Sequence, residues 1–376
     1  MIIRPDSPAA AAAALAGTDG PVCIRGAGTR TAWQPLPAPG PGLVVETTRL
    51  TGPGDLRPDN LSASFLAGTP LSDVHAQLQA AGLWFPVAHC DAPEATLGGC
   101  LAAGFESPLR FGYGPPRDWV LGLEVATPQG LIRFGADVIK NVAGYDLVKL
   151  HLGAWGRFGL ITRATLRLLP LPEASHTFSQ TFTGPDPLQV AGAAETAVRA
   201  ALAAGARPAA LELIGQPDHL RLLVATGTGN EDDWQAYSHQ RAAMTARYPW
   251  RLKLSLPAPG VAAALGLLDR ALSGLDWAVA GHAGSGIFTA WWDDPAGPAP
   301  ALNRLQAQAQ AVSADRWFVV AEGAAARAMT GQPGWVSFPP RPPRSQDRLE
   351  AALRAALAPG NFANPHLPSP TPEARS

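Results

Sequence analysis

Cysteine is scarce in this sequence, and neither sign of charge is in surplus. The three cysteines, Cys23, Cys90 and Cys100, are an odd number without a C-x-x-C pair. Neither a disulfide framework nor an iron-sulfur cluster is therefore expected within the chain. The formal net charge is -1. Because the chain has no basic stripe and no run of like charge, nucleic acid is not expected as a partner.

Long apolar runs are also missing. The apolar windows 254–268 and 277–292 are interrupted by proline or glycine and fall short of the roughly 20 apolar residues that a transmembrane helix needs. At the start of the chain, Ser7 and Pro8 precede an alanine run, which predicts a capped helix over 8–16 in place of a signal peptide. We expect a protein of the cytoplasm without a transmembrane segment.

The length of 376 residues, 47% of them hydrophobic, indicates at least two domains. Short strands alternate with helices up to about residue 175, including an amphipathic helix in SDVHAQLQAAGLW, 72–84. Prolines at 170, 172, 185 and 187 mark a boundary. Beyond it, helices at 188–205, 231–247 and 258–274 alternate with strands such as AALELIG, RLLVATG and FTAWW. The predicted domains are 1–175, 176–340, and a C-terminal helix and tail at 341–376.

Two glycine-rich loops are the first candidate binding elements. IRGAGTRTAW (24–33) follows a strand, and its small residues let backbone N–H groups converge on an anion. The loop is not a Rossmann fingerprint, because no helix follows it. An ordinary glycine turn is as good an interpretation of this loop as an anion-binding one. PEATLGGCLAAGF (93–105) offers a second small-residue bend. Taken alone, that segment could equally be a helix-packing surface.

A third segment, DVIKNVAGYDLVKLHLGAWGRFGLITRATLRLLP (137–170), concentrates polar groups. Lys140 is one of only three lysines in the chain and stands beside Asn141. Its side chain is either a functional donor or a solvated surface group. Tyr145 either joins a site or packs its ring against the fold. Asp146 is equally suited to capping the following LVKLHL helix.

In order and spacing, GAGTRTAW, ATLGGCLAAG, YGPPRDWVLGLEV and VIKNVAGYDLVKLHLGAWGRFGLITRATLRLLP resemble the FAD-binding domain of the vanillyl-alcohol oxidase (PCMH) type. Within that family they are most similar to the FAD-binding E subunits of bacterial glycolate oxidase. The resemblance implies an α+β fold, with a two-subdomain PCMH-type FAD-binding domain followed by a smaller α+β cap domain.

The resemblance also implies a site. The first loop would wrap the FAD pyrophosphate, the second would lie along the pyrophosphate and flavin, and the backbone at 159–162 would border the adenine and ribitol. The KNVAGYD turn would sit beside the isoalloxazine, where Lys140 and Asn141 are the catalytic candidates. The implied cofactor-binding residues are Gly26, Ala27, Gly28, Thr29, Arg30, Thr96, Leu97, Gly98, Gly99, Ala103, Lys140, Asn141, Gly144, Tyr145, Gly159 and Ile161.

Covalent attachment of the flavin is not expected. Relatives use a histidine in or near the first loop or a cysteine in the second, and the first loop of this chain has no histidine. His89 and Cys90 come just before the second loop, and Cys100 lies inside it. A buried small hydrophobe is the commoner role for such a cysteine, so FAD is expected to be non-covalent.

A metal site is not expected either. Relatives that oxidise D-2-hydroxyacids carry G-H-x-G-D-G-N-x-H, whose two histidines bind a divalent metal. This chain has GHAGSGIFT (281–289), in which His282 matches the first histidine, Ser285 replaces the aspartate and Thr289 replaces the second histidine. These relatives also carry an E-H-G motif further along the chain, and Glu322 of this chain lacks the adjacent histidine of that motif. One histidine does not hold a divalent ion well, so His282 is read as a hydrogen-bonded core or turn residue.

The function that the resemblance implies is that of an FAD-binding subunit in a glycolate dehydrogenase complex. It would relay electrons or support assembly beside a catalytic FAD subunit and an iron-sulfur subunit that together oxidise glycolate to glyoxylate. The complex could place the chain at the periphery of the inner membrane. Two alternatives stay open: a free-standing FAD-dependent 2-hydroxyacid dehydrogenase, and a flavin-free scaffold, because Ala27, Arg30 and Cys100 depart from common family residues.

Overall fold

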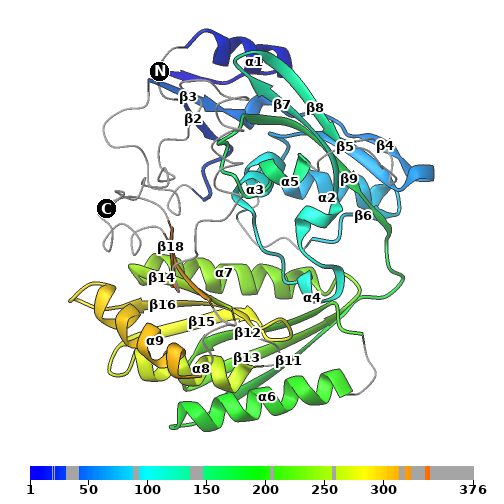
Figure 1. Ribbon diagram of the computed structural model, residues 1–376. Coiled ribbons are helices and arrows are strands. Elements are labelled where there is room, and N and C mark those ends of the chain that lie inside the picture. Colours follow the sequence, from blue (N-terminus) through cyan, green and yellow to red (C-terminus); the bar gives the residue numbers. More distant parts are fainter. Residues whose placement is uncertain are drawn as a thin grey trace.

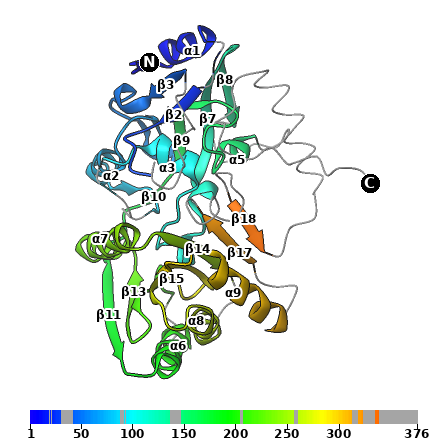
Figure 2. The ribbon, with the colours of Figure 1, turned by 90° about the vertical axis from the view of Figure 1, so that its left-hand side faces the viewer.

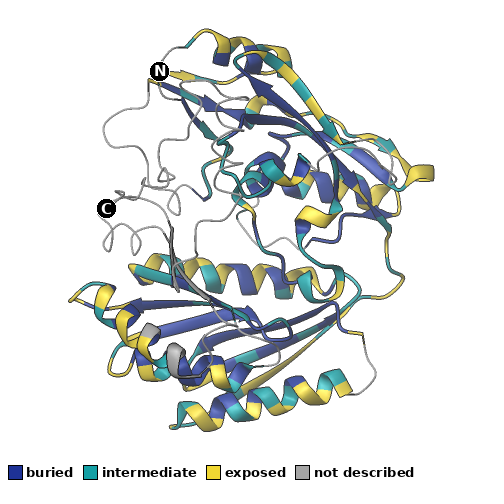
Figure 3. Cartoon of the chain, in the orientation of Figure 1, coloured by how far each residue is buried: buried dark blue, intermediate teal, exposed yellow. Residues whose placement is uncertain are grey.

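The computed structural model describes residues 1–18, 20, 22–30, 42–87, 92, 94–135, 147–203, 207–255, 260–312, 318–322 and 335–338. Two halves lie one above the other, each built around its own antiparallel sheet (Figure 1). The buried residues concentrate in the sheets and on the helix faces that cover them (Figure 3).

The chain begins with a small parallel sheet of strands β1 (Ile2–Ile3), β3 (Leu43–Glu46) and β2 (Val22–Arg25), in that order. Helix α1 (Pro8–Ala16) begins where the Ser7 side chain accepts a hydrogen bond from the Ala10 N–H at 3.2 Å. Proline at the first helical position loses no hydrogen bond there. Leu15 of α1 is fully buried against this sheet and β9.

The second sheet of the N-terminal half has five described strands, all antiparallel, in the order β4 (Asp55–Arg57), β5 (Ser62–Leu66), β9 (Leu160–Arg167), β7 (Val120–Thr127) and β8 (Gly130–Gly135). Alternate residues of β5, β7 and β9 share one apolar core with helices α2 (Leu71–Ala80), α3 (Leu97–Ala103) and α5 (Val148–His151). A short pair, β6 (Leu83–Trp84) with β10 (Leu169–Pro170), adjoins this core. In the part of the chain that the structure describes, 3₁₀ turns lie at η2 (Thr47–Arg49), η3 (Pro58–Asn60) and η4 (Pro116–Trp119).

The C-terminal half is an antiparallel sheet of eight described strands. Their order is β11 (His176–Thr183), β13 (His219–Thr226), β12 (Ala210–Gln216), β15 (Asp276–His282), β16 (Ile287–Asp293), β14 (Trp250–Ser255), β17 (Phe318–Glu322) and β18 (Trp335–Phe338). Helices α6 (Pro187–Ala203), α8 (Val261–Ala271) and α9 (Ala299–Val312) cover the face away from the N-terminal half. Helix α7 (Glu231–Arg247) lies on the other face, toward the N-terminal half (Figures 1 and 2).

The halves are joined by a continuous contact. Trp84 and Leu109 from the N-terminal half belong to the same buried cluster as α7 and the inner face of the large sheet. Short helix α4 (Arg110–Tyr113) follows Leu109, and the Gly112 N–H donates to the Ala209 carbonyl at 2.9 Å. A Cβ on Gly112 would lie 2.7 Å from the Ala209 Cα. Only glycine lets these two backbones approach so closely.

The predicted α+β class is confirmed, and most predicted elements are present. The helix over 8–16 is found with its Ser7 cap, and the predicted helix over 231–247 has those bounds. The helix predicted over 72–84 was too long: α2 ends at Ala80, Gly82 takes φ +69, and Leu83–Trp84 form strand β6. The predicted helix and tail at 341–376 lie outside the described residues. Among the described helices, none is long and apolar enough to cross a membrane.

His151 of α5 gives the N-terminal half an acid-sensitive group. Its ring is 3% exposed and lies 5.0 Å from the Phe134 ring, and its Nε2 has no hydrogen-bond partner among the described residues. Burial lowers the pKa of His151 from 6.5 to about 4. A histidine with a depressed folded-state pKa costs stability as the pH falls, because the unfolded chain takes up the proton first.

We expect the free energy of unfolding to drop by about 2 kcal/mol on account of His151 between roughly pH 7.5 and pH 5. Urea titrations across that range measure the effect. In His151→Phe, which keeps a ring in the same apolar surroundings, this part of the pH dependence should disappear. An identical pH slope in both proteins would show that His151 is not the responsible group.

Candidate functional site

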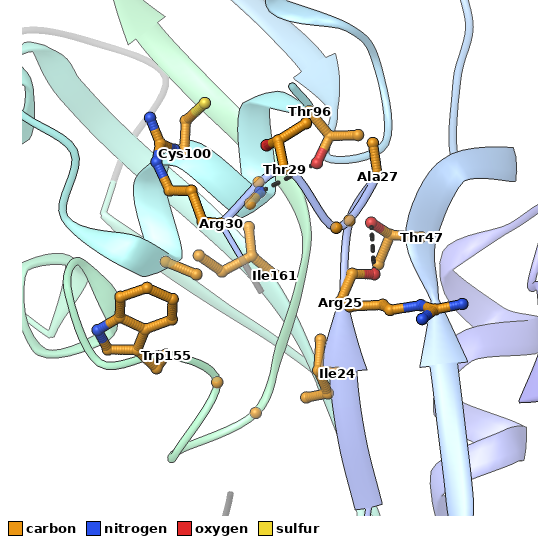
Figure 4. A pocket seen from close by; sticks show the side chains of 17 residues that line it. Ile24, Arg25, Ala27, Thr29, Arg30, Thr47, Thr96, Cys100, Trp155 and Ile161 are labelled. Carbon is orange, nitrogen blue, oxygen red and sulfur yellow. Dashed lines mark hydrogen bonds between the residues drawn. The ribbon is translucent and has the colours of Figure 1, made fainter. Parts of the chain in front are cut away.

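Three segments of the N-terminal half converge on one open cavity with about 690 Å³ of empty space. Figure 4 shows Trp155, Arg30 and Cys100 on one side of it, and Ile24, Arg25 and Thr47 on the other. Its lining is small, apolar or basic, and none of the described lining residues is acidic. The lining residues are Ile24, Arg25, Gly26, Ala27, Gly28, Thr29, Arg30, Thr47, Thr96, Gly98, Gly99, Cys100, Ala102, Trp155, Gly156, Gly159 and Ile161.

The first segment is the turn that follows β2. Gly28 takes φ +82, a conformation that favours glycine. Gly26 lies directly against the second segment, because a Cβ at this position would meet the Thr96 Oγ1 at 2.1 Å. The absence of a side chain at Gly26 therefore sets how closely the two loops approach.

The second segment is the start of α3. The Thr96 side chain accepts a hydrogen bond from the Gly99 N–H at 3.2 Å and caps the helix. The Gly98 N–H donates to the Ala67 carbonyl at 2.8 Å, and a Cβ at Gly98 would lie 2.5 Å from the Ala67 Cβ. Because Gly98 and Gly99 have no side chains, the start of α3 packs closely against the end of β5 on one side and against the first loop on the other.

The third segment runs from Gly153 into β9. The Trp155 N–H donates to the Ala102 carbonyl at 2.8 Å, which ties this segment to the end of α3. Trp155 itself takes φ +55, a strained region for a bulky residue. Gly159, at φ +139, lies over β7, where a Cβ would meet the Val125 Cγ1 at 2.4 Å. The strained backbone presents the Trp155 ring to the cavity (Figure 4).

Two arginines supply the positive charge of the cavity. Arg25 donates to the Glu46 Oε2 at 2.6 Å, and Arg4 donates to the Oε1 of the same carboxylate at 2.6 Å. The hydrogen bond from Arg4, together with those from Arg25 and Thr48, lowers the Glu46 pKa to about 2. Arg30 is 7% exposed, with its guanidinium 5.3 Å from the centre of the Phe105 ring.

The structure brings ten of the predicted cofactor-binding residues to the cavity wall: Gly26, Ala27, Gly28, Thr29, Arg30, Thr96, Gly98, Gly99, Gly159 and Ile161. Leu97 and Ala103 are not among its lining residues. Leu97 is 0% exposed and packs in the core of the N-terminal half, because a helix turns its successive side chains to different faces. The predicted Lys140, Asn141, Gly144 and Tyr145, and the capping candidate Asp146, lie outside the described residues.

The sequence analysis did not single out Thr47, Trp155 and Gly156 as cavity residues, whereas Ile24, Arg25 and Ala102 belong to the two candidate loops but were not named as cofactor-binding residues. One sequence feature did indicate that the third segment lies against another part of the chain. The run GAWGRFG puts three glycines at intervals of three, and the structure shows positive φ at Gly153, Gly156 and Gly159. Such spacing predicts a chain that turns repeatedly close to another surface. The side chain that those turns display, Trp155, stands inside the run.

Thr96 is expected to hold the second segment in place. In Thr96→Val the Gly99 N–H loses its acceptor, and we expect about 1 kcal/mol less stability together with weaker ligand binding at the cavity. Thermal melting and a ligand titration measure the two effects. Thr96→Ser keeps the hydroxyl and is the matched control. Equal losses in both variants would assign the effect to the Thr96 methyl group instead of the cap.

His282 does not stand alone in the second half. It is 3% exposed, and its Nδ1 lies 2.6 Å from the Glu212 Oε1. The Tyr237 hydroxyl donates to the Glu212 Oε2 at 2.7 Å. These contacts give His282 the hydrogen-bonded core position that the sequence suggested. Among the described residues, no group of three or more His, Cys, Asp or Glu side chains is arranged to hold a metal ion.

The comparisons with known proteins agree with this geometry. Residues 1–135 match the family model described as FAD binding domain. The chain is similar to the glycolate oxidase subunit GlcE of Escherichia coli (39% identical over 160 residues, 41% of this chain and 44% of the relative). It is also similar to the glycolate oxidase subunit GlcD of Bacillus subtilis (32% over 198 residues, 52% and 41%).

A further similarity is to a D-lactate dehydrogenase of Archaeoglobus fulgidus (36% identical over 151 residues, 40% of this chain and 33% of the relative). The matched region thus spans less than half of each of these relatives. The whole fold is similar to that of an alkyldihydroxyacetonephosphate synthase structure, with a TM-score of 0.65 over 97% of this chain and 76% of that one, at 13% identity.

Proposed function

Because residues 1–135 match the family model described as FAD binding domain, we propose that the chain is the FAD-binding subunit of a glycolate dehydrogenase complex. In this proposal a sister flavoprotein subunit oxidises glycolate, an iron-sulfur subunit carries electrons, and the present chain relays electrons or supports assembly. The observation that carries the proposal is the convergence of three glycine-rich segments on a cavity without described acidic side chains.

The cavity suits FAD on physical grounds. A pyrophosphate needs backbone N–H donors, close approach and positive charge. Gly26 and Gly28 offer the close approach, Arg25 and Arg30 the charge, and a Cβ at Gly26 would obstruct the junction of the two loops. The Trp155 ring offers an apolar surface on the third segment. Bound FAD would supply the capacity to accept and pass on electrons.

The second half supports a role without substrate oxidation of its own. The Nδ1 of His282 is engaged by Glu212, Thr289 stands where metal-using relatives carry their second metal-binding histidine, and Ser285 stands at the position of their aspartate. With three cysteines in the whole chain, iron-sulfur clusters belong to another subunit in this proposal. We place the complex in the cytoplasm or at the inner face of the membrane through its partners.

Purification of the chain alone tests the proposal. The protein should show a flavin absorption spectrum and release all its FAD on denaturation, because the cofactor is proposed to be non-covalent. Reduction of a dye by glycolate should be negligible until the sister subunits are co-expressed. Flavin that stays on the denatured chain would contradict non-covalent binding.

The free-standing alternative has some support, since one relative named above is a D-lactate dehydrogenase. It predicts robust turnover of glycolate or D-lactate by the isolated chain, and that result would replace the subunit proposal. An isolated chain that takes up no FAD at micromolar concentration would instead favour a flavin-free scaffold.

A further inference from the structure

A carboxylate from the N-terminal half is held by basic side chains at the junction of the two halves. Glu106 lies between α3 and α4. Its Oε1 accepts from the Lys253 Nζ at 2.6 Å, and its Oε2 accepts from an Arg110 guanidinium nitrogen at 2.6 Å. The His282 Nε2 lies 4.0 Å from the Oε2. These four residues are called the Glu106 cluster below.

The basic groups of the Glu106 cluster are fixed by the large sheet and its surroundings. Lys253 is in β14 and pairs with Thr289 of β16, while His282 ends β15. Glu212 binds the Nδ1 of His282 from the neighbouring strand, and this fixes the ring with its Nε2 toward Glu106. Two of the three basic groups therefore belong to the C-terminal half, and the third, Arg110, lies in the same segment as Glu106.

The charge of Glu106 is stabilised by its neighbours. Burial raises the Glu106 pKa, but the charges of Lys253, His282 and Arg110 outweigh burial and lower it to about 2. The carboxylate is therefore ionised at neutral pH. The side chains of Glu106 and Lys253 are 24% and 25% exposed, so the edge of the cluster is in contact with water.

The Glu106 cluster is linked to the cavity proposed to bind FAD through the residue that precedes Glu106 in the sequence. Phe105, the residue before Glu106, carries the guanidinium of Arg30 over its ring at 5.3 Å. Arg30 in turn lines the cavity. On the other side of the cluster, the Phe111 ring packs against Gly284, where a Cβ would lie 2.5 Å from the ring. The segment 105–111 thus connects the cavity to the C-terminal half.

We propose that Lys253, Arg110 and His282 form a binding site for small carboxylates, and that the chain fills this site with its own Glu106. Charge-assisted hydrogen bonds from two different side chains to the two oxygens of one carboxylate are the arrangement that recognises such a group. Glu106 supplies that group from within the chain. A dissolved monocarboxylate such as acetate or glycolate is thereby excluded.

The proposal does not depend on the flavin role, because it concerns the contacts of Glu106 with the sheet. It also gives a second reason, besides the pairing of His282 with Glu212, why the isolated chain would not act on a 2-hydroxyacid. Vacating the Glu106 position should convert the cluster into a site that an external carboxylate can enter.

The test uses the full chain with Glu106→Ala. The variant leaves Lys253 and Arg110 without their carboxylate, and we expect its melting temperature to fall by roughly 5 °C or more in chloride. Sodium acetate at equal ionic strength should raise that melting temperature saturably and restore at least half of the loss. The wild-type protein should melt at the same temperature in both salts.

Two matched variants make the test specific. Glu106→Gln fills the same volume, so acetate should not stabilise it. Adding Lys253→Met to Glu106→Ala removes a main donor and should abolish the acetate effect. Equal melting of Glu106→Ala in acetate and chloride would overturn the proposal, and so would an equal acetate effect on the wild type.

Refolding tests the carboxylate site even if Glu106→Ala folds poorly. If Glu106→Ala is insoluble, it is refolded in acetate and in chloride beside Glu106→Ser, which vacates the same carboxylate position. Recovery in acetate alone supports the proposal. Failure of both variants in both salts counts against it, because an external carboxylate should replace the missing one. FAD uptake, followed separately by flavin fluorescence, reports on the proposed function and not on this site.

Discussion

FAD affinity should fall at least about 100-fold, equal to about 3 kcal/mol, when Gly26 is replaced by alanine. The added Cβ would lie 2.1 Å from the Thr96 Oγ1. Thr96 is 3% exposed and its hydroxyl caps α3 through the Gly99 N–H, so it cannot turn away without losing the cap. The two loops must therefore separate by roughly 1 Å to restore contact distance.

Quenching of flavin fluorescence on titration of the apoprotein with FAD measures this affinity. Gly192→Ala is the matched control, because Gly192 lies in α6 with nothing within 4 Å of its added Cβ. Its FAD affinity should equal that of the wild type, and its stability should rise slightly with helix propensity. Unchanged affinity in Gly26→Ala would mean that FAD does not bind where the first two loops meet.

His282→Leu is expected to lower the free energy of unfolding by about 4 kcal/mol. The substitution leaves the Glu212 carboxylate, which is 0% exposed, with Tyr237 as its described hydrogen-bond donor. A buried charge that loses one partner keeps its desolvation cost and loses the compensating contact. The measurement is urea unfolding followed by tryptophan fluorescence, supported by circular dichroism of the folded variant.

A double-mutant cycle identifies the cause. Glu212→Gln removes the charge, so the combined variant with His282→Leu should be destabilised by clearly less than the sum of the two single variants. His219→Ser, at an exposed position of β13, is the control and should change stability by less than about 0.5 kcal/mol. Additive losses in the cycle would show that His282 and Glu212 are not coupled.

Local features of this chain could be predicted from its sequence where the cause is local. The Ser7 cap with Pro8 and the α7 bounds depend on neighbouring residues, and these predictions matched the structure. The end of α2 was missed because Gly82 can continue a pattern or break it, and the pairing of Leu83–Trp84 with β10 decided the outcome.

The charged pairs formed by residues far apart in the chain could not be predicted from its sequence. Glu106 and Lys253 are 147 residues apart, and Glu212 and His282 are 70 residues apart. Glu212 and His282 meet because β12 lies beside β15 in the large sheet, and Glu106 meets Lys253 of β14 where the N-terminal half contacts that sheet. No periodicity or motif encodes that order. The sequence shows that His282 lacks the second histidine of the metal-binding motif, but it does not show that the ring pairs with Glu212.

The cluster that Trp84 and Leu109 share with α7 and the large sheet has a thermodynamic consequence. Neither half can melt without exposing apolar surface on the other, and the Gly112 to Ala209 hydrogen bond would break in either case. Heating should therefore give one calorimetric peak for both halves. A destabilising substitution far from the cavity proposed to hold FAD should therefore also change the temperature at which the cofactor is released.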